Sequence, residues 1–128
     1  MSLSILHYAI PACDKESAER IFKELFGLEQ KKSFFLSPQL SYEIFQINEP
    51  IEAIVYGNEH CTFEVFLIKD VGTVSVHHIC VEVESKEEFC KKCEKLDINI
   101  QFVQKAEKTL VFIRDDAGNL FEMKFRKS

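Results

Sequence analysis

The sequence predicts an α+β fold made of two similar modules, each a strand and a helix followed by further strands. Two short strands that carry a histidine, "ILHYAI" at 5–10 and "VHHICVEV" at 76–83, each lead into a helix. The distance from His7 to a good helix N-cap at Asp14 equals the distance from His78 to a good N-cap at Ser85. Strand-like segments then follow each helix, so the pattern β-α-β-β-β occurs twice.

The helix of the first module is expected to begin after Asp14, whose carboxylate can accept hydrogen bonds from the first free amides of a helix. Gly27 stands where a glycine commonly ends a helix. Between these two positions apolar residues recur at helical spacing: Ala18, Ile21, Phe22, Leu25 and Phe26.

The helix of the second module has a sequence signal of its own. Ser85 and Glu88 form an S-x-x-E capping box, and the helix should end near Asp97. Its buried stripe is expected to consist of Phe89, Cys93 and Leu96.

The remaining segments are predicted to be strands. In the first module they are 32–37, 41–47, 51–56 and 61–68, with the pairing of 51–56 left open. In the second module they are 99–104, 108–114 and 119–126, and "DDAGN" is read as the turn before the last one. We expect one domain over 1–128, with module one at about 4–70 and module two at about 75–127.

Composition narrows the class of protein. A formal net charge of -5 without an obvious basic patch argues against nucleic-acid binding. No apolar run is long enough to span a bilayer, and "MSLSILHYAI" does not resemble a signal peptide. Five cysteines at irregular spacing are then most simply free thiols, so we expect a cytoplasmic protein.

Alternation along the strands decides which histidine can carry chemistry. Neighbouring side chains of a strand point to opposite faces, so His77 and His78 cannot serve the same site. The match with His7 selects His78 and turns His77 toward the packing face. Cys80 should share the face of His78 and is therefore a candidate to line a substrate cavity.

Two glutamates complete the pattern. Glu64 in "CTFEVFLI" and Glu122 in "NLFEMKF" each interrupt an apolar strand near the end of a module. A carboxylate on an enclosed sheet face is costly unless it is paired or binds a metal. Together with His7 and His78 they would make a four-ligand site of nitrogen and oxygen donors, suited to Zn, Ni, Co, Fe or Mn. Phe66 shares a strand face with Glu64 and is a second candidate to line the cavity.

Over about residues 5–125 the chain resembles the vicinal oxygen chelate superfamily, which includes glyoxalase I, bleomycin-resistance proteins, fosfomycin-resistance enzymes, methylmalonyl-CoA epimerases and extradiol dioxygenases. The segments that carry the resemblance are "LHYAIPACDKESAERIFKELFGL", "HHICVEV" and "RDDAGNLFEMKF". The most specific mark is the closing D-x-x-G-N-x-x-E. The resemblance implies an open, cup-shaped mixed sheet with helices outside.

His7, Glu64, His78 and Glu122 fall on the four metal positions of the superfamily, a set that looks most like the glyoxalase I branch. The resemblance implies one divalent metal per site, with Ni, Co or Zn expected first and Mn or Fe next. It implies a lyase or isomerase in which the metal holds a small substrate through vicinal oxygens. A ligand glutamate, Glu122 with Glu64 as its counterpart, removes a proton next to the carbonyl to give an enediolate. The short members usually form homodimers, often with metal ligands from both subunits.

The resemblance supports the metal ligands more strongly than it supports a particular substrate. The glyoxalase I branch usually has an Arg soon after the first ligand histidine and an Asn soon after the first ligand glutamate, and both contact glutathione. Here "HYAIPACD" has no Arg and "EVFLIKD" has no Asn. A substrate other than a glutathione hemithioacetal is therefore open.

Two other functions stay open at this point. One is a metal-free protein that binds a small molecule or drug, as bleomycin-resistance proteins do. The other is a metal enzyme of a different branch, namely an epimerase, a thiol transferase or an extradiol dioxygenase. The pair Cys90 and Cys93 is read as part of a helix rather than a redox motif, and His60 as a solvent-exposed residue of a polar turn.

Overall fold

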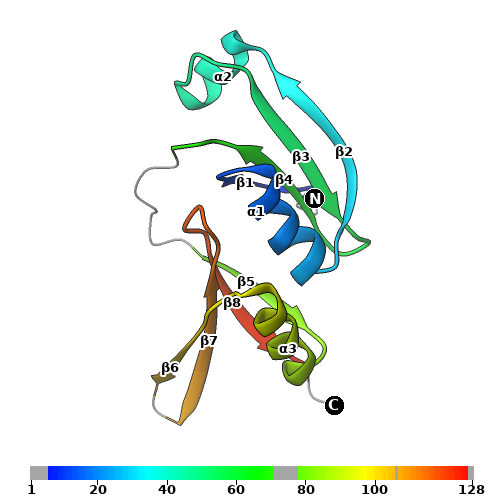
Figure 1. The fold of residues 1–128 in the computed structure, drawn as a ribbon, viewed down its shortest axis with the longest axis vertical. Coiled ribbons are helices and arrows are strands. Elements are labelled where there is room, and N and C mark those ends of the chain that lie inside the picture. The colour runs from blue at the N-terminus through cyan, green and yellow to red at the C-terminus, as the bar shows by residue number, and fades with distance from the viewer. Residues whose placement is uncertain (1–5, 71–77, 106, 127–128) are drawn as a thin grey trace, which may run out of the picture. The chain divides into compact units, whose positions relative to one another are not determined.

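The structure is a computed structural model, and it describes residues 6–70, 78–105 and 107–126. The chain divides into two compact units, Met1–Val71 and Gly72–Ser128, and each unit contains one four-stranded mixed sheet (Figure 1). Within the described residues, no helix is both long and apolar enough to cross a membrane.

The first unit contains four strands and two helical segments. Its elements are β1 (Tyr8–Ala12), α1 (Lys15–Ala18) continuing directly into the π-helix η1 (Glu19–Leu25), β2 (Glu29–Leu36), α2 (Pro38–Phe45), β3 (Ile51–Gly57) and β4 (Thr62–Leu67). The strand order in the sheet is β1-β4-β3-β2.

The second unit repeats this arrangement with one helix. Its elements are β5 (His78–Val83), α3 (Lys86–Leu96), β6 (Ile100–Lys105), β7 (Lys108–Arg114) and β8 (Leu120–Phe125). The strand order is β5-β8-β7-β6, the same as in the first unit once α2 is set aside. In both sheets the first strand pairs parallel with the last, and the other pairs are antiparallel. The predicted α+β fold of two β-α-β-β-β modules is confirmed.

The predicted strand at 41–47 is wrong, because this segment belongs to α2. The Ser37 hydroxyl accepts a hydrogen bond from the Leu40 amide at 3.2 Å, and Pro38 occupies the first turn, where its missing N–H costs nothing. Phe45 and Ile47 then pack against an apolar cluster on the sheet that contains Phe66. Tertiary packing of this short apolar segment therefore outweighs its strand-like composition.

The first strand also lies later than 5–10. It covers Tyr8–Ala12 and pairs with β4 from Tyr8–Phe63 to Ala12–Leu67. Because β1 is at the edge of the sheet, Pro11 is tolerated there despite its missing amide donor. His7 thus stands immediately before the strand rather than within it. In the second module the predicted strand 76–83 is observed from His78, and residues 76 and 77 lie outside the described part of the chain.

Both predicted helix starts are confirmed. Asp14 Oδ1 accepts a hydrogen bond from the Ser17 amide at 2.8 Å, and the Ser17 hydroxyl completes a capping box that the sequence did not indicate. The Ser85 hydroxyl accepts a hydrogen bond from the Glu88 amide at 3.2 Å. The second helix ends at Leu96, before Asp97 in the left-handed conformation, as expected.

The first helix covers the sheet face opposite to Glu64. Its Phe22 ring lies 5.6 Å from the Tyr56 ring and 5.1 Å from the Phe63 ring, measured between centroids. Tyr56 and Phe63 are cross-strand partners, so they share one face, and Glu64 points to the other. In the second unit Phe89 of α3 contacts Phe125 of β8 at 5.7 Å between ring centroids. The first helix (α1 with η1) and α3 therefore each pack on the sheet face opposite to the glutamate.

The "DDAGN" turn is confirmed and places the last strand. Asp115 accepts hydrogen bonds from the amide and the side chain of Asn119, both at 2.8 Å. Gly118 has a φ of 86°, a conformation that other residues rarely adopt. The turn returns the chain antiparallel to β7, so that Phe112 lies opposite Glu122.

We predict that Asp14→Ala lowers the free energy of unfolding by about 1 kcal/mol near neutral pH, since the first helix loses its cap. The hydrogen bonds donated by Ser17 hold the pKa of Asp14 below its ordinary value. A carboxyl with a lowered pKa stabilises the fold above the ordinary pKa of Asp and loses that contribution as the pH falls. Urea unfolding at pH 7 and at about pH 3 checks this. A difference between variant and wild type that does not shrink at low pH would contradict it.

Candidate functional site

His7 and Glu64 come together at one edge of the first sheet. Ala9 of β1 is the register partner of Glu64 in β4, and His7 stands two residues before Ala9. His7 Nε2 lies 3.8 Å from Glu64 Oε2, with side chains 44% and 23% exposed. Parallel pairing of β1 with β4 thus brings an imidazole and a carboxylate, far apart in the sequence, onto one partly open face.

The second sheet repeats this register. Cys80 of β5 is the partner of Glu122 in β8, and His78 stands two residues before Cys80. In both units the histidine therefore stands two residues before the register partner of the glutamate. In the sequence, His7 and His78 match because each stands at the same distance from a helix cap. The strand register matches the same two histidines.

Glu122 has a neighbour that sequence analysis missed. Its Oε2 atom lies 3.2 Å from Nζ of Lys124, which is two residues further along β8 and so on the same face. The Glu122 side chain is 15% exposed and that of Lys124 is 54% exposed. The spacing Glu-x-Lys in this strand could have indicated the ion pair, because residues two apart in a strand share a face. The equivalent position in the first sheet is Phe66, so the two glutamates have different surroundings.

Cys80 lies on the same face as Glu122 by strand register, as its candidate role requires. It is a free and exposed cysteine. Partial burial, and next the negative charge of Glu122, raise the pKa of its thiol above the ordinary value. The thiolate is the form that binds metals and attacks electrophiles. Because the pKa of its thiol is raised, Cys80 is expected to line this face as a protonated, neutral thiol.

The donors present fit a divalent metal in their chemistry. Imidazole nitrogen and carboxylate oxygen bind Zn, Ni, Co and Mn, and the His7–Glu64 face is open to solvent on one side. Among the described residues, no group of three or more His, Cys, Asp or Glu side chains is placed to hold an ion.

A polar hollow of about 300 Å³ adjoins His7. It is lined by residues at the start of β1 and in the turn between β3 and β4: Leu6, His7, Tyr8, Asn58, Glu59, His60, Cys61 and Thr62. The side chain of His60 is 75% exposed, as expected, and its Nε2 lies 3.4 Å from Glu59 Oε1. The sequence did not indicate that this turn lies beside His7, because that proximity depends on the pairing of β1 with β4.

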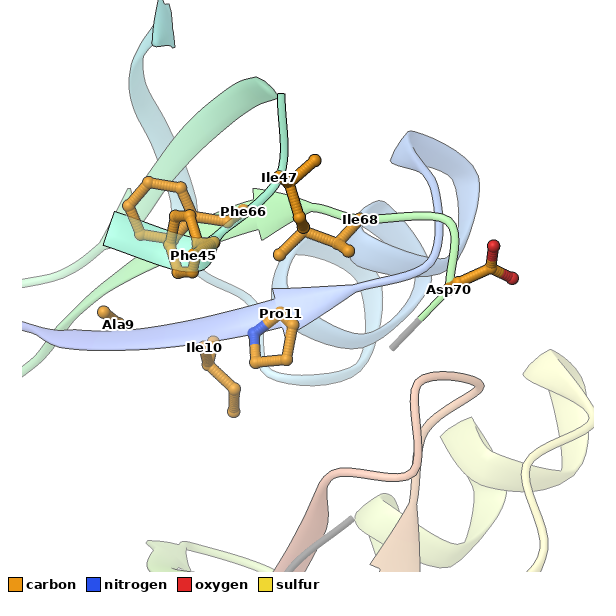
Figure 2. Close-up of a pocket in the computed structure, with 8 residues that line it drawn as sticks. All are labelled: Ala9, Ile10, Pro11, Phe45, Ile47, Phe66, Ile68 and Asp70. Carbon is orange, nitrogen blue, oxygen red and sulfur yellow. The ribbon is translucent and has the colours of Figure 1, made fainter. Parts of the chain in front are cut away.

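A second hollow of about 250 Å³ lies on the glutamate face of the first sheet, at the C-terminal end of α2 (Figure 2). Its walls are almost entirely apolar: Ala9, Ile10, Pro11, Phe45, Ile47, Phe66 and Ile68, with Asp70 as the single charged residue. Phe66, a predicted cavity residue, is one of them. The sequence analysis missed Phe45 and Ile47, because it assigned them to a strand.

Cys90 and Cys93 lie within α3, and both are free. Cys93 is 1% exposed, and its burial raises the pKa of its thiol to about 11. A thiol of this kind is a core residue and not a redox centre at neutral pH.

The fold agrees with known structures over nearly the whole chain. A variant of the fosfomycin resistance protein FosX from Listeria monocytogenes, in complex with Mn(II) and 1S,2S-dihydroxypropylphosphonic acid, has a TM-score of 0.71 at 12% identity, covering 96% of this chain and 90% of that one. A glyoxalase family protein from Bacillus cereus has a TM-score of 0.73 at 18% identity, covering 100% and 97%. A lactoylglutathione lyase from Agrobacterium tumefaciens has a TM-score of 0.63 at 20% identity, covering 95% and 92%.

The protein therefore has the fold that these solved structures share. At identities of 20% or less, the likeness is one of fold. No model of a known protein family matches the sequence, and no curated protein matches it. The reaction must therefore be argued from the site.

We predict that iodoacetamide labels Cys80 at least about tenfold faster than Cys93 in the native protein at pH 8, because Cys93 is buried and protonated. Peptide mass spectrometry after timed labelling measures both rates in one sample. In guanidinium chloride the two rates should become similar, which controls for the reactivity of each peptide. Equal native rates would contradict the assignment of Cys93 to the core.

Proposed function

We propose that the protein is a divalent-metal-dependent lyase or isomerase of the glyoxalase I type. The observation that supports this most directly is the shared register of the two His–Glu pairs: His7 with Glu64 beside β1 and β4, and His78 with Glu122 in β5 and β8. Four nitrogen and oxygen donors from two equivalent positions would hold one metal ion, either within one chain or between two chains of a homodimer. Ni, Co and Zn are the expected metals, followed by Mn and Fe.

The metal, when bound, supplies a Lewis acid that polarises the oxygens of a small substrate. Glu122 is the proposed general base, which removes a proton from the carbon next to a carbonyl and returns it to the neighbouring position. It is the more enclosed of the two glutamates, with its side chain 15% exposed against 23% for Glu64. Glu64 is its proposed counterpart in the site.

The substrate is proposed to be a small molecule with vicinal oxygens, without a requirement for glutathione. No Arg follows His7 in "HYAIPACD" and no Asn follows Glu64 in "EVFLIKD", although the glyoxalase I branch uses such residues to bind glutathione. The surroundings of Glu64 support a different choice, since Phe66 and the apolar hollow occupy that face of the sheet.

We predict that wild-type protein binds one divalent ion per site, and that His7→Ala, Glu64→Gln, His78→Ala and Glu122→Gln each weaken binding by at least about tenfold. Loss of a residue that merely supports a metal ligand costs about 10–100-fold in affinity, so loss of a ligand should cost no less. Isothermal titration with Ni(II), Co(II), Zn(II) and Mn(II) measures the affinities. Glu122→Gln should in addition abolish deuterium exchange at the carbon next to the carbonyl of the substrate.

Two variants serve as controls for this titration. Glu29→Gln removes an exposed glutamate that pairs with Lys31 on β2, and Glu87→Gln removes an exposed glutamate that pairs with Lys91 on α3. Both should bind the metal as the wild type does. If the wild type binds none of the four ions, or if the ligand variants behave like the controls, the proposed function is wrong.

We predict that Lys124→Met strengthens metal binding by about threefold to tenfold, because an ammonium group 3.2 Å from Glu122 repels an incoming cation and occupies a carboxylate oxygen. The same titration measures the change. Lys91→Met, which removes a lysine from a glutamate pair on α3, is the matched control and should leave the affinity unchanged. A weaker metal affinity in Lys124→Met would mean that the lysine supports the site.

One observation favours a second candidate function, a metal-free protein that binds a small molecule. The hollow of about 250 Å³ beside Phe66 is apolar, as such a function would need. Ligand binding that is unchanged by EDTA and by Glu64→Gln would support this candidate against the metal enzyme.

A further inference from the structure

The apolar hollow of the first unit is built by two parts of the chain that meet on the glutamate face. The floor consists of residues of β1 and β4, and the cover consists of Phe45 and Ile47 at the end of α2 (Figure 2). The Phe45 ring lies 5.0 Å from the Phe66 ring at an angle of 60°, an edge contact that holds the end of the helix over the sheet. Phe66 itself is 6% exposed.

This hollow begins next to Glu64. Ala9, one of its wall residues, is the register partner of Glu64, so the two lie on adjacent strands about 4.8 Å apart and on the same face. Phe66 stands two residues beyond Glu64 on the same strand and the same face. A group bound in the hollow would therefore lie directly beside the candidate ligand Glu64.

The size and chemistry of the hollow define what it can hold. An apolar cavity of about 150 Å³ is enough for a benzene molecule, so a space of about 250 Å³ admits a phenyl ring or a branched alkyl chain. Its walls offer no positive charge, and the single charged residue is the carboxylate Asp70. An anionic group would be repelled there, whereas an apolar group would gain from leaving water.

We infer that this hollow is a specificity pocket, which receives an apolar group of about phenyl size carried by the substrate next to its vicinal oxygens. The inference rests on the proposed function, because it places the oxygens on a metal held in part by His7 and Glu64. It assigns the substrate to a class, compounds with an aromatic or branched apolar substituent beside the reacting carbon. Methyl-substituted substrates would leave the pocket unfilled.

Two chelating probes test this class directly. Acetohydroxamate and benzohydroxamate present the same pair of vicinal oxygens to a metal and differ in a methyl against a phenyl group. We expect benzohydroxamate to bind the metal-loaded wild type at least about tenfold more tightly, measured by isothermal titration with the metal that binds best. Because both probes have the same chelating group, any withdrawal of metal from the protein affects both alike.

Variants that fill or enlarge the pocket should shift the preference among hydroxamate probes toward smaller or larger apolar groups, respectively. Ala9→Leu fills the space beside Glu64 and should reduce the preference for benzohydroxamate to less than about threefold, with acetohydroxamate bound as before. Ile47→Ala enlarges the far wall and should improve binding of the larger 2-naphthohydroxamate relative to benzohydroxamate. Ile44→Ala is the matched control, since Ile44 is on α2 but is 54% exposed and does not line the pocket.

The outcomes separate the pocket from the metal site. Equal affinities of the two probes for the wild type, or a loss of both probes alike in Ala9→Leu with metal binding intact, would overturn the pocket while leaving the proposed function in place. Failure of the wild type to bind any metal would overturn the proposed function, and the pocket inference with it. A preference for the phenyl probe that Ala9→Leu removes and Ile44→Ala retains supports the inference.

Discussion

Parallel pairing between the first and last strands of each module is the constraint on which the site depends. It sets Ala9 beside Glu64 and Cys80 beside Glu122, and the histidine two residues earlier follows from the pleat. In each unit the connection between the two parallel strands begins with a helix that packs on the opposite face of the sheet. This helix therefore buries the face opposite to the glutamate.

The two modules share one backbone arrangement, but the side chains around their glutamates differ. Beyond Glu64 the next residue on the same face is Phe66, which lines an apolar hollow closed by α2. Beyond Glu122 it is Lys124, whose ammonium group forms an ion pair with the glutamate. Equivalent His–Glu positions thus have apolar surroundings in the first unit and a charged neighbour in the second.

The element that creates this asymmetry is α2. It has no counterpart among the described residues of the second module, and it covers part of a sheet face that the first helix leaves bare. Its packing is apolar and specific, with the Phe45 ring against the Phe66 ring.

The sequence alone determined the repeat, the helix caps at Asp14 and Ser85 and the closing turn, because these depend on local signals. It named His7 and Glu64 as candidates, but only the parallel pairing of β1 with β4 brings their side chains together. It did not determine α2, since a short apolar segment such as 41–47 fits a strand or a helix equally until its packing partners are known. It also could not show that Phe45 and Ile47 form a pocket with Phe66. These contacts depend on side chains that only the tertiary structure brings within reach of one another.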